Sequence, residues 1–313
     1  MTNIEAVLSR RQVPKTERAL HVSLMCVREA RPCVLAIFLL RFALSVAMTA
    51  TIVDHGQLAR ACVAALVWEL GVFSTYLFNG VMDVQEDRIN GSRRPIARGA
   101  LPTGIAAWVA ATAAALSLAG GFALGREIAW AVVMLLVLGY LYSGPPAYLK
   151  RQPFGTAVTV VAMGLLTFYA GSAAYAGPSG FYQGIALPIF AGAMSLWLGL
   201  VGMPTKDLSD VDGDRAAGRR SFAIVYGESV AWRVPAVTAC GLAVAFCVAG
   251  AFLAPSLIWP ATVMLGGALV IAAVCLSRAS RGCRRRRRRP YRVFMATQFL
   301  AHFSVLPALC THF

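Results

Sequence analysis

The stretch ARACVAALVWELGVFSTYLFNGVMDVQED, residues 59–87, joins a long apolar run to a group of polar side chains. The apolar part has the roughly 20 residues that an α-helix needs to cross a bilayer. At its end, Asn79, Asp83 and Asp87 follow one another at intervals of four residues. Evenly spaced acids are costly at the end of a membrane helix, so their presence needs an explanation.

Similar apolar runs recur along the whole chain. Only helices and closed barrels satisfy every backbone group in lipid, and these runs lack the alternation of barrel strands. The sequence therefore predicts an all-α integral membrane fold with nine transmembrane helices in a bundle. The predicted spans lie near residues 33–53, 59–80, 102–123, 127–143, 155–177, 183–204, 230–252, 256–277 and 291–311.

Composition supports the membrane assignment. Of the 313 residues, 58% are hydrophobic and only 14% are charged, whereas soluble domains carry about 25% charged residues. Residues 1–32 are polar and basic, so we expect a cytoplasmic N-terminal segment there, no cleaved signal peptide, and a single membrane domain over 33–313. The eight cysteines are scattered without a CxxC pair, which argues against a zinc site or a disulfide framework.

The basic residues predict the orientation. The net charge of +15 could suggest nucleic-acid binding, but arginine and lysine gather in the N-terminal segment and in every second loop. Such loops lie on the cytoplasmic side. We therefore expect a cytoplasmic N-terminus, an external C-terminus, a place in the plasma membrane and no nucleic-acid partner. The run Arg284–Arg289 is expected to meet anionic lipid headgroups.

A second acidic cluster stands in KDLSDVDGDRAAGRRSFAIVYG, residues 206–227, after the sixth predicted span. Helical spacing puts Asp207, Asp210 and Asp214 on one face, as it does Asn79, Asp83 and Asp87, while Asp212 and Glu86 are expected to point away. Oxygen ligands without histidine or cysteine suit Mg²⁺, which is commonly held by carboxylates together with substrate phosphates. The bland alternative is a solvated acidic loop, or acids paired with nearby arginines: Arg88, Arg93, Arg215 and Arg219.

Two charges fall deep within predicted spans. Arg41 lies in the first span and Glu69 in the second, at similar depths. Charges inside the membrane usually pair or mark a functional site. We expect these two side chains to form a structural ion pair.

The two acidic motifs together resemble those of the UbiA superfamily of intramembrane prenyltransferases. The pattern N-x-x-x-D-x-x-x-D before NGSRRPIARG resembles the first signature. KDLSDVDGDRAAGRRSFAIVYG resembles the second, and LYSGPPAYLKR, residues 141–151, is similar to a third stretch in the branch of homogentisate prenyltransferases and chlorophyll synthases. Arg31-Pro32 also fits, whereas the arginine run does not belong to the family pattern.

The resemblance implies a helical bundle around a central cavity and a Mg²⁺-dependent reaction of a prenyl diphosphate donor with a small, aromatic or other nucleophilic acceptor. Asp83 and Asp87 would hold one metal ion, and Asp210 and Asp214 the other. Asp207 and Asn79 would be ligands or would orient ligands. The expected diphosphate-binding residues are Arg94, Lys150, Lys206 and Tyr142.

Two other functions remain open. A terpene cyclase on the same scaffold would use a prenyl diphosphate without a separate acceptor. In that branch the middle aspartate of the first motif is often altered, and the intact Asp83 favours transfer. A transporter could also show weakly repeated motifs, but it has no evident need for two carboxylate faces suited to magnesium.

Overall fold

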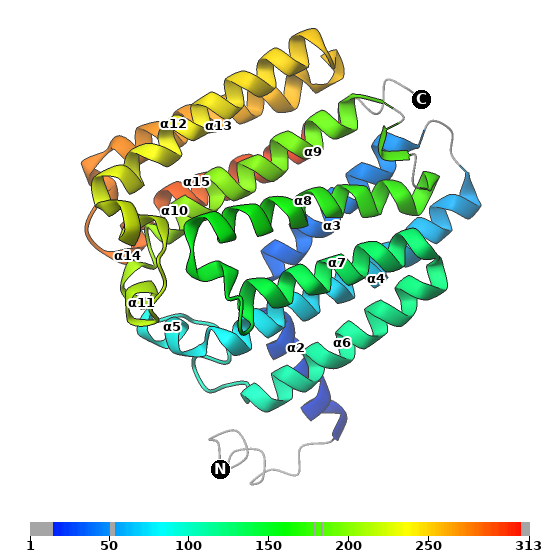
Figure 1. The fold of residues 1–313 in the computed structure, drawn as a ribbon, viewed down its shortest axis with the longest axis horizontal. Coiled ribbons are helices and arrows are strands. Elements are labelled where there is room, and N and C mark those ends of the chain that lie inside the picture. The colour runs from blue at the N-terminus through cyan, green and yellow to red at the C-terminus, as the bar shows by residue number, and fades with distance from the viewer. Residues whose placement is uncertain (1–14, 51–53, 178–179, 183, 308–313) are drawn as a thin grey trace.

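The computed structural model describes residues 15–50, 54–177, 180–182 and 184–307. These residues form a bundle of α-helices, joined by short 3₁₀ segments and one π-helical segment, and none of them forms a strand (Figure 1). The long helices are α2 (Lys15–Glu29), α3 (Pro32–Thr49), α4 (His55–Met82), α6 (Thr103–Leu124), α7 (Arg126–Ser143), α8 (Pro153–Ala176), α9 (Ala186–Leu196), α12 (Phe222–Phe252), α13 (Ile258–Leu276) and α15 (Arg289–Phe303).

The predicted spans correspond closely to these helices. Eight segments of the described chain are long and apolar enough to cross a membrane, the sixth being α9 continued to Asp207. The ninth predicted span begins with α15, which has 15 residues, and its last residues lie outside those described. The all-helical membrane fold is thus confirmed, and the ninth span stays a prediction.

Several helices of the bundle cross closely at glycine residues. A Cβ on Gly171 of α8 would overlap the carbonyl of Phe42 in α3, and a Cβ on Gly139 of α7 would overlap Thr75 in α4. Membrane helices use such small residues to approach closely, because lipid supplies little hydrophobic drive between helices. Other large apolar side chains are exposed on the outside of the bundle, as Trp108 and Phe252 are. The outside is therefore suited to lipid.

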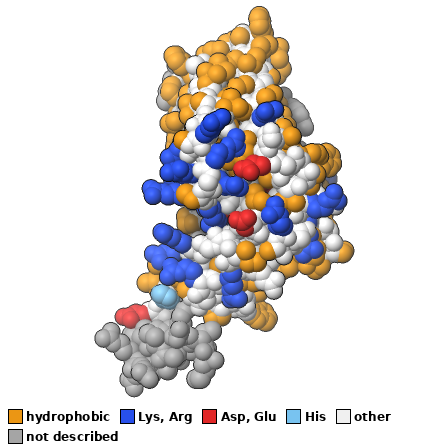
Figure 2. Space-filling model, turned by 90° about the vertical axis from the view of Figure 1, so that its left-hand side faces the viewer, with side chains coloured by type: hydrophobic (Ala, Val, Ile, Leu, Met, Phe, Trp, Pro, Cys, Tyr) orange, Lys and Arg blue, Asp and Glu red, His pale blue; other side chains and the backbone are white. Residues whose placement is uncertain are grey.

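The short helices gather at one end of the bundle. These are α5 (Val84–Ile89), α10 (Met203–Asp207), α11 (Val211–Ala216) and α14 (Arg284–Arg287), and they lie together at the left of Figure 1. Figure 2 looks onto that end, where Lys and Arg side chains crowd around two acidic patches. The predicted cytoplasmic loops therefore meet on one face, together with both acidic motifs.

The expected ion pair between Arg41 and Glu69 is wrong. Arg41 is fully buried, and its Nη2 donates to the carbonyl of Met194 at 3.2 Å and to Oε1 of Gln298 at 2.9 Å. Glu69 forms no ion pair with any residue that the structure describes, and its Oε1 has no hydrogen-bond partner there. The similar depth of the two residues in the membrane did not predict their partners. Arg41 faces α9 and α15, which are far from it in the sequence.

Candidate active site

The two acidic motifs meet where long helices are interrupted. Helix α4 ends at Met82, and Asp83 joins it to α5. The sixth span passes through a π-helical segment, Trp197–Gly202, before α10 and α11. Such segments often occur at functional sites. In each motif the polar residues are thus divided between two successive helices and the junction between them, rather than placed on one continuous face.

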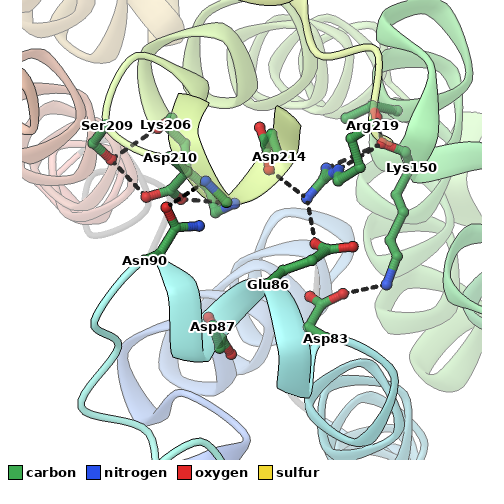
Figure 3. A network of polar contacts seen from close by, with 12 residues as sticks. Asp83, Glu86, Asp87, Asn90, Lys150, Lys206, Ser209, Asp210, Asp214 and Arg219 are labelled. Atoms are coloured by element: carbon green, nitrogen blue, oxygen red, sulfur yellow. Dashed lines mark hydrogen bonds and ion pairs between the residues drawn. The ribbon is translucent and has the colours of Figure 1, made fainter. Parts of the chain in front are cut away.

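Helices α5 and α11 pack together at the centre of the site. The backbone N–H of Gly213 donates to Oδ1 of Asn90 at 3.0 Å, and Asn90 lies in Figure 3 between the two motifs. A Cβ at position 213 would overlap the Asn90 side-chain amide. The glycine of the second motif therefore serves a close approach between the motifs.

Asp83 is paired with Lys150, a residue that the sequence had placed at the diphosphate. Both side chains are buried and form an ion pair. Lys150 stands in a 3₁₀ turn, Leu149–Arg151, at the end of LYSGPPAYLKR. Burial alone would raise the pKa of Asp83, but the Lys150 ammonium holds this pKa below its ordinary value. Asp83 therefore stays ionised, as a metal ligand must.

Asp87 points away from Asp83 and toward the N-terminal helix (Figure 3). Its Oδ2 pairs with Nη1 of Arg94 at 2.6 Å, and Nε of Arg94 pairs with Glu29 of α2 at 2.8 Å. Glu29 is fully buried, and its Oε2 also accepts from the backbone N–H of Ile96 at 2.8 Å. The first motif is therefore tied to α2, a helix that the sequence reading did not predict.

Asp210 is surrounded by cations. Its Oδ2 lies 3.3 Å from Nζ of Lys206 and its Oδ1 lies 2.9 Å from Nη2 of Arg284. Although burial raises the pKa of Asp210, these cations hold it well below the ordinary value. Arg284 is the first residue of the arginine run, so one member of that run reaches the acidic motif rather than lipid.

Arg219 joins the two motifs, and here the sequence reading needs correction. Its Nη1 lies 3.2 Å from Glu86 and 3.2 Å from Asp214, and its guanidinium donates to the carbonyl of Lys150. Glu86, expected to point away, is buried inside the site (Figure 3), because the break after Met82 changes the direction of the second turn. Burial raises the pKa of Glu86. Asp212 is exposed, as expected.

The alternative of acids neutralised by neighbouring arginines is only partly met. Of the arginines named for that role, Arg219 forms ion pairs with acids of the motifs within the described chain. Arg88 instead donates to the carbonyl of Ala97 at 3.3 Å. Asp83 and Asp87 pair with two cations expected at the diphosphate, Lys150 and Arg94. Asp210 pairs with a third, Lys206, and also with Arg284.

A cavity opens beside these residues and runs into the bundle. Its polar end is lined by Asp83, Lys150, Lys206 and Arg219 together with Asn79 and Tyr142, and its inner part by apolar side chains. Nδ2 of Asn79 donates to Oγ of Ser143 at 2.9 Å, which orients the amide at the cavity wall. The apolar lining residues include Val34, Ile37, Phe38, Val160, Met163, Leu198 and Met295.

The cavity also has lining residues that the sequence reading did not assign. Arg31 lies at the polar end and has a left-handed backbone, with φ 63° and ψ 82°. Such strain in a residue other than glycine often accompanies functional sites, and the Arg31-Pro32 dipeptide was the available signal. Tyr76, Tyr291 and Gln298 complete the wall, and no local pattern singles them out.

The donor set fits Mg²⁺ completed by a substrate. Within the described residues, no three His, Cys, Asp or Glu side chains converge as a ready-made metal centre. Mg²⁺ commonly takes only one or two carboxylates and adds water and substrate phosphates. Asp207 is buried, and its Oδ1 has no hydrogen-bond partner. An unpartnered buried carboxylate oxygen is unfavourable, so a cation beside it would be stabilising.

Known proteins are similar to this chain in sequence. A sequence profile of the UbiA prenyltransferase family matches residues 36–303. Homogentisate phytyltransferase from Synechocystis sp. is 25% identical over 224 residues, which cover 69% of this chain and 67% of that enzyme. Digeranylgeranylglyceryl phosphate synthase from Pyrococcus abyssi is 31% identical over 166 residues, so the chain spans only 55% of that relative's length.

The fold comparison agrees with the sequence comparison. The structure of a UbiA homolog from Archaeoglobus fulgidus bound to DMAPP and Mg²⁺ superposes with a TM-score of 0.63 at 20% sequence identity. The match covers 90% of this chain and 99% of that chain. The helical bundle is therefore shared over nearly the whole of both chains.

Proposed function

Because this chain belongs to the UbiA prenyltransferase family, we propose that it is a Mg²⁺-dependent intramembrane enzyme that transfers an isoprenoid chain from a prenyl diphosphate to a small acceptor. The observation that carries the proposal is the cavity, which joins an acidic and basic end to an apolar interior. A prenyl diphosphate has the matching distribution of charge and hydrocarbon. The solved homolog bound to DMAPP and Mg²⁺ supports this choice of ligand.

The acids of the two motifs would hold the metal ions. Asp83 and Asp87 would hold one ion, which requires Asp87 to leave Arg94 and turn toward Asp83. Asp210 and Asp214 would hold the other, and Asp207 and Asn79 would act as ligands or orient them. Mg²⁺ bound there would act as a Lewis acid on the charge that develops on the leaving diphosphate. Lys150, Lys206, Arg94 and Tyr142 would contact the diphosphate oxygens, with the three cations exchanging a carboxylate partner for a phosphate oxygen.

The reaction breaks the bond between the allylic carbon and the diphosphate oxygen, and it forms a bond from that carbon to the acceptor. The acceptor gives up a proton when it is an aromatic carbon or a hydroxyl group. Preorganised cations in a site that excludes water stabilise the departing diphosphate strongly. The apolar lining would enclose the isoprenoid chain and keep water from the allylic cation.

Two acceptor classes are suggested by the names of the relatives. One relative is a homogentisate phytyltransferase, and another is a digeranylgeranylglyceryl phosphate synthase. We propose an aromatic acceptor resembling a quinone precursor, because the second and third motifs follow the homogentisate and chlorophyll branch. A glycerophosphate acceptor is the competing outcome of the test below.

The arginine and lysine distribution supports a site that faces the cytoplasm, in a protein that we propose lies in the plasma membrane. The helices of both acidic motifs lie at one end of the bundle (Figure 1), which is rich in Lys and Arg (Figure 2), and positive loops lie inside. Residues 1–32 would then form a cytoplasmic segment and residues 33–313 one membrane domain with an external C-terminus. The diphosphate released by the reaction is soluble in water and would leave the site into the cytoplasm.

The test uses purified protein in a neutral detergent with Mg²⁺. Dimethylallyl, geranyl, farnesyl and geranylgeranyl diphosphate are each supplied with an aromatic acceptor, with a glycerophosphate acceptor, or alone. We expect release of diphosphate and formation of a prenylated aromatic product. Chelation of Mg²⁺ should stop this reaction, and added Mg²⁺ should restore it. A hydrocarbon product without acceptor would identify a cyclase, and no consumption of any donor by folded protein would overturn the proposal.

A further inference from the structure

Five of the six arginines of the run line one of two cavities, and the sixth, Arg287, pairs with Glu228 at 3.2 Å. Arg284 and Arg288 line a cavity of about 450 Å³ together with Lys206, Asp210 and Arg31. Arg285, Arg286 and Arg289 line a separate surface cavity with Cys283 and Arg292. Residues four apart share a helix face, which explains why Arg284 and Arg288 point the same way. Only part of the run therefore meets the site.

Arg284 is held at the site by specific contacts. Its Nη2 pairs with Oδ1 of Asp210 at 2.9 Å and its Nε donates to the carbonyl of Ser209 at 3.3 Å. Nη1 has no hydrogen bond to any described residue. The side chain is 35% exposed, so it remains reachable from the cavity. A guanidinium has five N–H donors in a fixed fork, and some of these stay available for a second anion.

Arg288 lies beside a residue shared with the donor cavity. Its guanidinium carbon is 5.7 Å from the centre of the Tyr291 ring, and Tyr291 lines both this cavity and the deeper one. Arg31 and Lys206 are also common to the two cavities. The arginine-lined space is therefore continuous in its lining with the polar end of the donor site.

The charge of this space is strongly positive. Its two carboxylates, Asp87 and Asp210, are each already paired with cations. Its remaining cations form no ion pair with the described part of the chain: Arg28, Arg31, Arg93, Arg98 and Arg288. Several guanidinium groups around a pocket favour an anion with many acceptor oxygens, and arginine forks match phosphate geometry in particular.

We infer that Arg284 and Arg288 bind the diphosphate of the prenyl donor from the side opposite Lys150, and that the rest of the run does not. The inference rests on the proposed function, since it assigns further residues to the same diphosphate. It changes the meaning of the run, which the sequence alone explained by lipid headgroups. Two of its six arginines are donor-binding residues, brought to the site by the turn between α13 and α15.

The run provides its own matched control. The double variant Arg284→Ala/Arg288→Ala removes the same charge from the same segment as Arg285→Ala/Arg286→Ala. Titration calorimetry would measure binding of inorganic diphosphate with Mg²⁺ in neutral detergent, where no anionic lipid competes. Steady-state kinetics would give kcat and KM for the donor. Thermal unfolding would check that both variants fold.

We expect the first variant to bind diphosphate about tenfold or more weakly and to raise KM for the donor similarly, with a smaller change in kcat, because each lost charge-assisted hydrogen bond weakens binding about tenfold. The control should stay within about twofold of the wild type. Arg284→Lys should be intermediate, because lysine keeps the charge and loses the fork.

Equal weakening in the control variant would overturn the inference, since it would show a general effect of surface charge. Unchanged diphosphate binding in the Arg284→Ala/Arg288→Ala variant would overturn it as well. In both cases a wild type that still turns over prenyl diphosphate leaves the proposed function standing. A wild type that neither binds diphosphate nor consumes any donor would instead remove the proposed function.

Discussion

The acids of the site differ in burial and in partner, and these differences rank them. Asp83, Asp207, Asp210 and Asp214 are buried, whereas Asp212 is exposed. Glu86 is buried against Arg219, which also holds Asp214. A substitution at Asp212 should therefore change only a solvated charge, while a substitution at Glu86 alters the charge balance around Arg219.

Replacement of single acids tests this ranking. We expect Asp83→Asn and Asp210→Asn each to lower turnover by about a hundredfold or more, because a lost metal ligand removes several kcal/mol of transition-state stabilisation. Asp212→Asn should be nearly silent, and Glu86→Gln should fall between them. The measurements are donor turnover and thermal unfolding of each variant. Equal losses for Asp212→Asn and Asp210→Asn would contradict the assignment of the second motif.

The buried Arg41 offers a second test within the membrane. Gln298→Leu removes the acceptor 2.9 Å from Arg41 Nη2 and leaves, among the described residues, the carbonyl of Met194 as its hydrogen-bond partner. We expect the free energy of unfolding to fall by about 1.5–3 kcal/mol, the usual contribution of a hydrogen bond to a charged group. Denaturant unfolding in detergent would measure the change.

Glu69→Gln is the control for that experiment. Glu69 makes no ion pair with the described residues, and its buried Oε1 has no hydrogen-bond partner there, so its neutralisation should not lower the free energy of unfolding. A large loss for Glu69→Gln, with no further loss when it is combined with Arg41→Met, would restore the ion pair that the structure contradicts.

Interrupted helices bring the motifs together. The first motif turns from α4 into α5 at Asp83, and the second passes from α10 into α11 just before Asp210. The contact between Gly213 and Asn90 joins the two short helices. The absence of a side chain at Gly213 leaves room for the Asn90 amide that makes this contact.

Gly213→Ala tests that contact. The added methyl group overlaps the Asn90 amide, so the amide has to move and the contact between α5 and α11 should weaken. Small displacements of catalytic groups can cost up to roughly a hundredfold in rate, so we expect turnover to fall by about tenfold or more. Gly241→Ala is the control, because a Cβ there meets no atom within 4 Å. If both variants kept full activity, the result would show that the reaction does not depend on the close contact between the motifs.

The bundle as a whole places its polar groups at one end and its hydrocarbon-facing side chains around the sides. Figure 1 shows the short helices of the site at one end, and Figure 2 shows the basic face over them. This arrangement suits a substrate with an ionic head in the interface and a hydrocarbon tail in the membrane. It also makes orientation in the membrane a decisive property.

Labelling of single cysteines tests the orientation. Cys283 is exposed and adjoins the arginine run, so a membrane-impermeant maleimide should label it only after the cell membrane is opened. The variant should retain Cys283 and carry alanine at the other cysteines. A cysteine introduced as Gln57→Cys, at the opposite end of α4, should react in intact cells. Labelling of Cys283 in intact cells would contradict a cytoplasmic site.

Much of this architecture could be predicted from the amino-acid sequence. Apolar runs predict the spans because lipid leaves a backbone no choice but to bond within its own helix. The acids at positions 83, 87, 210 and 214 are recognisable because acids are rare next to such runs. Both features depend on neighbours in sequence, and the structure gives helices α3, α4, α6, α7, α8, α12 and α13 close to the predicted spans.

The partners of the charged groups could not be predicted from the sequence, because these contacts join residues that are far apart in the chain. Arg41 bonds to Gln298, Glu86 to Arg219 and Asp210 to Arg284. The helical phase placed Glu86 on the wrong side, because this argument assumes one continuous helix. Helix α4 in fact ends at Met82. Hydrophobic periodicity and charge are thus set by local chemistry, whereas the pairing of buried charges follows from how the helices cross and where they end.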